Sequence, residues 1–228
     1  MNTPNLAKQL NINTDLALKV LKTFIRDEVR KVGIEHVVIG LSGGIDSALA
    51  CYLAAKAIGT HNIFAVRLPY KSSSKDSLDH AQLVVDALGV SSETFDITDM
   101  ADPLIDRTPG ITEKRKGNIM ARARMIVLYD RSAQYNGLVM GTSNKTELLL
   151  GYGTLFGDLA SALNPIGDLY KTQVRQLAQA VGVPQPIINK APSADLWAGQ
   201  TDEKEMGVTY AEVDQLLYLL IDERYSID

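Results

Sequence analysis

Segment 42–47 contains the residues whose types and spacing point most directly to chemistry. Its sequence is Ser-Gly-Gly-Ile-Asp-Ser, and it lies between an apolar run and an Ala/Leu-rich stretch. Two adjacent glycines allow a tight turn with free backbone amides, and the start of a following helix adds partial positive charge. These features predict a binding site for a phosphate or pyrophosphate group.

Asp46 within this segment indicates what else the site needs. A carboxylate beside bound phosphates repels them unless a cation lies between, so Asp46 predicts Mg²⁺. The alternative is that Asp46 caps the helix and that the glycines serve packing. Two familiar phosphate-binding loops do not match, because no Gly-Lys-Ser/Thr follows and the glycine spacing differs from the dinucleotide fingerprint.

The elements that position this segment alternate between strands and helices. Apolar runs predict strands over 36–41, 63–68, 93–97 and 138–141, and helical periodicity predicts helices over 14–32, 45–58, 75–88, 117–135, 169–181 and 210–220. This order predicts an α/β fold with a Rossmann-like, doubly wound parallel sheet and helices on both faces. Ligands bind such sheets beyond the carboxyl ends of the strands, here 42–47, 67–74 and 142–147.

The first long helix, over 14–32, shows an amphipathic pattern. Leu16, Val20 and Phe24 recur at every fourth position, with Leu21, Ile25 and Val29 beside them. Segments 98–116 and 197–208 are polar, and we expect them to be connections that become ordered when ligand binds.

Composition restricts the classes of partner. The 228 residues are 46% hydrophobic and 22% charged, with 23 Lys and Arg against 27 Asp and Glu, so nucleic acid is not an expected partner. The single cysteine, Cys51, forms no intramolecular disulfide framework. The chain start lacks secretory features, and the apolar runs are shorter than the roughly 18 residues of a membrane span. We expect one cytoplasmic domain over 1–228 with no membrane partner.

Several segments resemble a known enzyme family. A strand followed by segment 42–47 resembles the pyrophosphate loop of the N-type ATP pyrophosphatases, which split ATP between its α and β phosphates and adenylate a substrate. Segments 116–125, 141–172 and 190–203 resemble the NAD synthetase family within that superfamily, and they include Lys-Gly-Asn-Ile-Met-Ala-Arg-Ala-Arg-Met and Gly-Thr-Ser-Asn-Lys-Thr-Glu. The resemblance extends from about residue 14 to the end, with the motifs in order.

The resemblance implies a ligase reaction. ATP would activate the carboxylate of deamido-NAD as an acyl adenylate, and ammonia would then give NAD, with AMP and pyrophosphate as the other products. It also implies Mg²⁺ and a homodimer. Because only about 35 residues precede the first strand, we expect no amidase domain in this chain, and hence direct use of ammonia or its supply by a separate amidase subunit. The family continues further at its C-terminus, so we expect this chain to lack a C-terminal tail.

The resemblance also implies residue roles. Asp46 and Lys171 would be catalytic, and Asp46 and Glu147 would bind the metal ion. The positions that match ATP contacts are Gly40, Leu41, Ser42, Gly43, Gly44, Ile45, Asp46, Ser47, Arg67, Thr142, Lys171 and Ser193. The positions that match the deamido-NAD site, which in this family lies largely at a dimer interface, are Asn118, Arg122, Tyr129 and Asp158. Leu155 and Ala162 stand where some members carry Lys and Asp, so those two contacts are not expected.

Structural alternatives exist for these residues, and other functions exist for the fold. Glu147 could be a solvated helix charge, Lys171 a surface lysine, Arg122 part of an exposed helix face and Tyr129 a packing residue. A tRNA-thiolating enzyme would need a basic face and usually catalytic cysteines, so the acidic balance and the single cysteine, within a predicted helix, argue against it. A non-catalytic nucleotide-binding module would have no reason to hold Asp46, Glu147 and Lys171 together. GMP synthetase is the nearest enzyme rival, but its C-terminal dimerisation segment is not recognised in this sequence.

Overall fold

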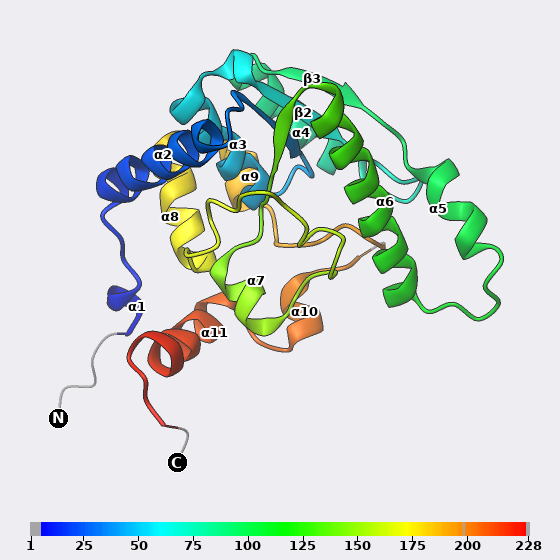
Figure 1. The fold of residues 1–228 in the computed structure, drawn as a ribbon. Helices are drawn as coiled ribbons and strands as arrows, with labels where there is room; N and C mark the ends of the chain where they lie inside the picture. Colours follow the sequence, from blue (N-terminus) through cyan, green and yellow to red (C-terminus); the bar gives the residue numbers. More distant parts are fainter. Residues whose placement is uncertain (1–5, 198, 227–228) are drawn as a thin grey trace.

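A parallel four-stranded sheet forms the centre of the computed structural model, which describes residues 6–197 and 199–226 (Figure 1). The strands are β1 (His36–Gly40), β2 (Ile63–Arg67), β3 (Ser91–Thr94) and β4 (Gly137–Met140), in the order β3-β2-β1-β4. The register places Val38 of β1 between Phe64 of β2 and Val139 of β4. The predicted α/β class and parallel sheet are confirmed.

Helices cover both faces of this sheet, as Figure 1 shows. One face packs on α2 (Thr14–Lys31), α3 (Ile45–Ile58), α4 (Lys75–Leu88), α8 (Lys171–Val181) and α9 (Gln185–Asn189). The other face packs on α5 (Thr98–Ile105) and α6 (Glu113–Gln134). Consecutive residues of β1 serve both cores, since Val37 and Ile39 contact the first and Val38 the second.

A smaller group of elements lies beyond the sheet. It comprises α7 (Lys145–Leu150), α10 (Asp202–Met206), α11 (Tyr210–Leu217) and a turn of π-helix over Tyr218–Asp222. The short helix α1 (Leu6–Gln9) reaches back to this group, and Leu10 packs with Tyr170, Tyr210 and Leu217. None of the helices within the described residues combines the length and apolar character that crossing a membrane requires.

The expected connection over 98–116 contains α5 and the first turn of α6, and its ordering on ligand binding stays a prediction. Pro103 and the polar sequence disfavour a helix locally, but Ala101 and Ile105 are buried against α6. Helix α6 begins before the predicted residue 117 because Thr112 caps it, accepting a hydrogen bond from the Arg115 amide at 3.4 Å. Segment 197–208 likewise contains α10, and residue 198 lies outside the described residues.

The third strand also differs from its predicted bounds, 93–97. It begins at Ser91 and ends at Thr94, although the amides of Phe95 and Ile97 still donate to the β2 side, at Arg67 and Pro69. The strand ends early because the Asp96 carboxylate accepts from the Thr98 amide at 2.8 Å and starts the turn into α5.

The amphipathic pattern of α2 divides into a buried line and an exposed one. Ile25 and Val29 are fully buried against α3 and α8, whereas Leu16 and Val20 are 57% and 56% exposed and Phe24 is also exposed. Both sets of apolar residues recur at every fourth position, as expected for one face of a helix. The sequence alone therefore does not say which set packs against the neighbouring helices.

Matched truncations on α2 test this assignment. Val29→Ala should lower the free energy of unfolding by about 2 kcal/mol, because it leaves a cavity in a closed core. Val20→Ala deletes the same atoms from a side chain that is exposed to solvent, and it should change that free energy by less than about 0.5 kcal/mol. Urea unfolding followed by circular dichroism measures both, and equal losses would contradict the assignment.

Candidate functional site

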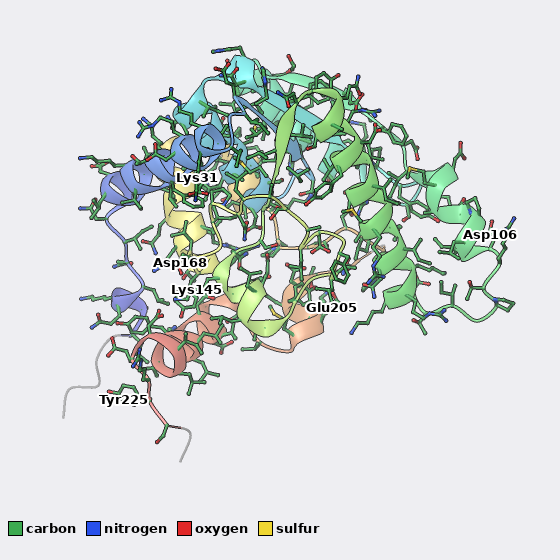
Figure 2. All side chains as sticks on the ribbon, in the orientation of Figure 1. Lys31, Asp106, Lys145, Asp168, Glu205 and Tyr225 are labelled. Atoms are coloured by element: carbon green, nitrogen blue, oxygen red, sulfur yellow. The ribbon has the colours of Figure 1, made fainter. Side chains whose placement is uncertain are left out.

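A cleft of about 430 Å³ opens where β1, β2 and β4 end. Segments 40–42 and 44–47 form one wall. Asn118 and Arg124 of α6 and residues 141–142, which follow β4, also line the cleft. Segment 190–197 and α10 complete it, and Glu205 of α10, labelled in Figure 2, is one of the lining residues. The cleft therefore lies at the strand ends that the sequence singles out.

The glycine turn at residues 43–44 is fixed by its neighbours. Gly43 has φ +75°, and a Cβ there would collide with the main-chain carbonyl of Ser77 at the start of α4. The Ser42 hydroxyl accepts from the Gly44 amide at 3.2 Å, and the Ser47 hydroxyl donates to the Gly44 carbonyl at 3.1 Å. Gly43 is thus required by close approach and backbone conformation, and the two serines form hydrogen bonds across the turn.

Three charged side chains from three helices meet beside this turn. The Lys171 Nζ donates to Asp46 Oδ2 at 2.5 Å and to Glu147 Oε1 at 3.2 Å, and the Lys171 side chain is only 3% exposed. The second Asp46 oxygen accepts from the Asn144 side chain at 2.9 Å. The helix-cap interpretation of Asp46 is wrong, because Gly44 occupies the cap position of α3. A surface position for Lys171 is also excluded.

Glu147 has a second role at the start of α7. Its Oε2 accepts from the Asn144 amide at 3.2 Å while the Asn144 side chain accepts from the Glu147 amide at 3.0 Å, which forms a capping box. Burial raises the pKa of Glu147 to about 7, against the opposing effect of the Lys171 ammonium. Burial alone would lower the pKa of Lys171, but Asp46 and Glu147 outweigh it and raise that pKa.

A buried carboxylate from the C-terminal part of the chain holds two of these helix starts together. Asp214 of α11 is fully buried; it accepts from the Thr146 hydroxyl at 2.6 Å and from the Thr172 amide at 2.8 Å. The Thr146 hydroxyl in turn accepts from the Lys171 amide at 3.0 Å. Asp214 therefore sets the separation of Glu147 and Lys171, and sequence reasoning missed it because no local signal marks it.

A further buried acid, Asp202, lines the cleft near Lys171. It accepts from the Tyr210 hydroxyl at 3.0 Å and from the Tyr152 hydroxyl at 3.2 Å, and burial raises its pKa. The Lys171 Nζ lies 5.0 Å from the centre of the Tyr210 ring. Asp202 is part of a sequence segment used for the family resemblance, so the motif could have identified it.

The cleft brings together most of the predicted site residues. Those that line it are Gly40, Leu41, Ser42, Gly44, Ile45, Asp46, Ser47, Asn118, Thr142, Glu147, Asp158, Lys171 and Ser193. Gly43 contributes to the turn behind them. Asn118 and Asp158 are connected through Thr154, whose hydroxyl donates to Asn118 and whose amide donates to Asp158, both at 2.9 Å.

Arg67, Arg122 and Tyr129 do not line the cleft. Arg67 binds the Gln82 side chain, and Arg122 donates to the Leu155 carbonyl at 3.1 Å. Tyr129 is 40% exposed on α6. Their ligand contacts stay predictions.

The charge balance of the cleft is negative. Six carboxylates line it, against four cationic side chains, which are Lys114, Arg124, Lys171 and Lys190. A triphosphate entering this cleft would be repelled without added cations. Within the described residues, no three His, Cys, Asp or Glu side chains cluster as a metal site.

Comparison with known proteins gives a consistent family. The model of the NAD synthase family matches residues 17–228. The "NH(3)-dependent NAD(+) synthetase" of Trichlorobacter lovleyi is 61% identical over 95% of this chain and 79% of its own length. That of Chlorobaculum parvum is 55% identical over 97% of this chain and 80% of its own.

Solved structures agree with the sequence matches. The NMN synthetase of Francisella tularensis superposes with a TM-score of 0.87 and 37% identity, covering 96% of this chain and 89% of that one. The NH3-dependent NAD synthetase of Campylobacter jejuni, in complex with nitrate, superposes with a TM-score of 0.80 and 36% identity. The match covers 94% of this chain and 86% of that one.

The raised pKa of Glu147 predicts a pH-dependent stability. The folded chain retains this proton up to about pH 7, whereas an ordinary glutamate releases it near 4.5, so stability falls as pH rises through this window. Relative to the Glu147→Gln variant, the unaltered chain should lose up to about 3 kcal/mol of unfolding free energy across it. Urea unfolding in magnesium-free buffer measures the difference, and parallel pH curves would contradict it.

Proposed function

The chain belongs to the NAD synthase family, and we propose how its cleft carries out the ammonia-dependent synthesis of NAD. ATP and deamido-NAD react to give an acyl adenylate and pyrophosphate, and ammonia converts the adenylate into NAD and AMP. The observation that carries this assignment is the contact of Lys171 with both Asp46 and Glu147 beside the glycine turn. The family excludes the tRNA-thiolating, GMP synthetase and non-catalytic alternatives.

The glycine turn is proposed to hold the phosphates of ATP. Helix α3 begins at Ile45, directly after the cap residue Gly44, and both residues line the cleft, so the helix dipole would favour an anion bound there. Lys171 lies nearby on a helix start that Asp214 and Thr146 fix. As charge moves onto the departing pyrophosphate, the fixed ammonium stabilises it without reorganisation.

The donor set fits Mg²⁺. Asp46 and Glu147 supply two carboxylates from different helices, and their shared contact with the Lys171 ammonium supports a cation site between them. Magnesium prefers one or two carboxylates together with phosphate oxygens and water. Asp46 and Glu147 would hold the ion, which would offset the negative charge of the cleft and of the phosphates.

The protein side chains do not form covalent bonds to substrate in this scheme. The nicotinate carboxylate of deamido-NAD attacks the α-phosphorus, the bond to the bridging oxygen breaks, and pyrophosphate leaves with the electron pair. Ammonia then attacks the activated carbonyl, loses a proton and expels AMP. Positioning and charge stabilisation account for both steps.

Asn118 and Asp158 are proposed to bind deamido-NAD within the cleft, because both line it and are connected through Thr154. Arg122 and Tyr129 lie exposed on α6, outside the cleft. They would act where a second copy of the chain meets this face, so we propose a homodimer. The cytoplasmic location and the single domain over 1–228 stay predictions.

The first test is a direct assay with ATP, Mg²⁺, ammonium and either deamido-NAD or nicotinate mononucleotide. The second acceptor is included because the similar Francisella tularensis structure is an NMN synthetase. We expect NAD, AMP and pyrophosphate in equal amounts with deamido-NAD. Product formed only from the mononucleotide would contradict the proposed acceptor, and pyrophosphate without an amide product would contradict the proposed second step.

Asp46→Asn should reduce turnover at least about 100-fold, because it removes a charge that balances Lys171 and is proposed to bind the metal ion. The amide can still accept from Asn144 or Lys171, so the fold should persist, as circular dichroism and urea unfolding would show. Asp99→Asn, on the exposed first turn of α5, is the matched control. Near-normal activity of the first variant would contradict the assignment.

A further inference from the structure

Lys190 is a cation of the cleft to which no role has been given so far. It follows α9 and lines the cleft, and its Nζ donates to the Ser77 hydroxyl at 2.8 Å. It is half-buried, and it forms no ion pair with any part of the chain that the structure describes. An ammonium in this setting has lost water without gaining a carboxylate partner.

The position of Lys190 is tied to the glycine turn. Ser77, which accepts its hydrogen bond, is the residue whose carbonyl packs directly against Gly43. Lys190 therefore approaches the turn from the α4 side, whereas Lys171 lies at the start of α8. An anion in the turn would have one lysine from each of two separate segments nearby.

The two lysines differ in how their charge is balanced. Lys171 is neutralised by Asp46 and Glu147, both within 3.2 Å. Lys190 has only the Ser77 hydroxyl, and burial lowers its pKa, although Asp195 and Asp76 oppose this from a greater distance. The positive charge of Lys190 is therefore less compensated than that of Lys171, so Lys190 would attract an incoming anion more strongly.

The other cationic side chains of the cleft are less suited to this role. Arg124 donates its Nε to the Leu68 carbonyl at 2.9 Å, on the α6 wall. Lys114 is exposed on the first turn of α6. Only Lys190 among these hydrogen-bonds to a residue that contacts the glycine turn.

We propose that Lys190 binds the phosphates held in the glycine turn, those that leave as pyrophosphate, and exchanges its Ser77 contact for a phosphate oxygen. This inference rests on the proposed function, since it takes ATP as the ligand of the turn. It makes Lys190 a second phosphate-binding cation. Ser77 holds its side chain ready before ATP arrives.

Calorimetric titration with ATP, AMP and pyrophosphate, in the presence of Mg²⁺, tests the proposal. Lys190→Met should weaken ATP and pyrophosphate binding about tenfold or more and leave AMP binding nearly unchanged, because AMP lacks the departing phosphates. Lys190→Arg keeps the charge and should recover part of the affinity. Lys75→Met is the matched control, since Lys75 also lies at the start of α4 but is exposed and paired with Asp79.

The outcomes separate this inference from the function. Equal weakening of ATP and AMP by Lys190→Met, or no weakening of ATP, overturns the phosphate contact. If the unaltered chain binds ATP but forms no NAD, the proposed function fails while the Lys190 comparison still decides this inference. If it binds neither ATP nor pyrophosphate, both fail. Circular dichroism of each variant shows whether it has folded. Lys190→Arg repeats the ATP, AMP and pyrophosphate titrations with a smaller change of side chain.

Discussion

The buried contact of Lys171 with Asp46 and Glu147 is the interaction on which the site depends. Removing three charges from water is costly, and their attraction offsets the cost only when the distances are short and the remaining polar atoms are bonded. Neighbouring polar residues provide these additional hydrogen bonds. Asn144 bonds both acids, and Thr146 with Asp214 fixes the main chain under the lysine. The convergence of α3, α7 and α8 follows from this requirement.

The same constraint explains the order of the elements around the sheet. Asp46 follows β1 and Glu147 follows β4, and these two strands are neighbours in the parallel sheet, so their carboxyl ends deliver both acids to one edge. The glycine turn needs α4 close behind it, and the cleft needs α6 on its other wall. The proposed phosphate site would thus lie where a doubly wound sheet leaves a crevice.

Local pattern was enough to predict the alternation of strands and helices and the segment 42–47, because periodicity and glycine spacing are local properties. The meeting of Asp46 with Glu147 could be expected from the strand ends, and the role of Lys171 from the family resemblance. Asp214 could not be predicted, since its partners Thr146 and Thr172 lie far away in the sequence. The buried side of α2 and the helix containing Pro103 depend on neighbours in the same way, and propensity alone misjudges them.

Asp214 has a consequence for how the molecule matures. A chain emerging from the ribosome contains all four strands, the glycine turn and both acids well before residue 214 appears. Until α11 docks, Thr146 and Thr172 lack their common acceptor, and the starts of α7 and α8 are joined by the bond from the Lys171 amide to Thr146 without the added carboxylate. The sheet can therefore assemble during translation before α11 docks, and the helix that carries Asp214 then adds an acceptor shared by the starts of α7 and α8.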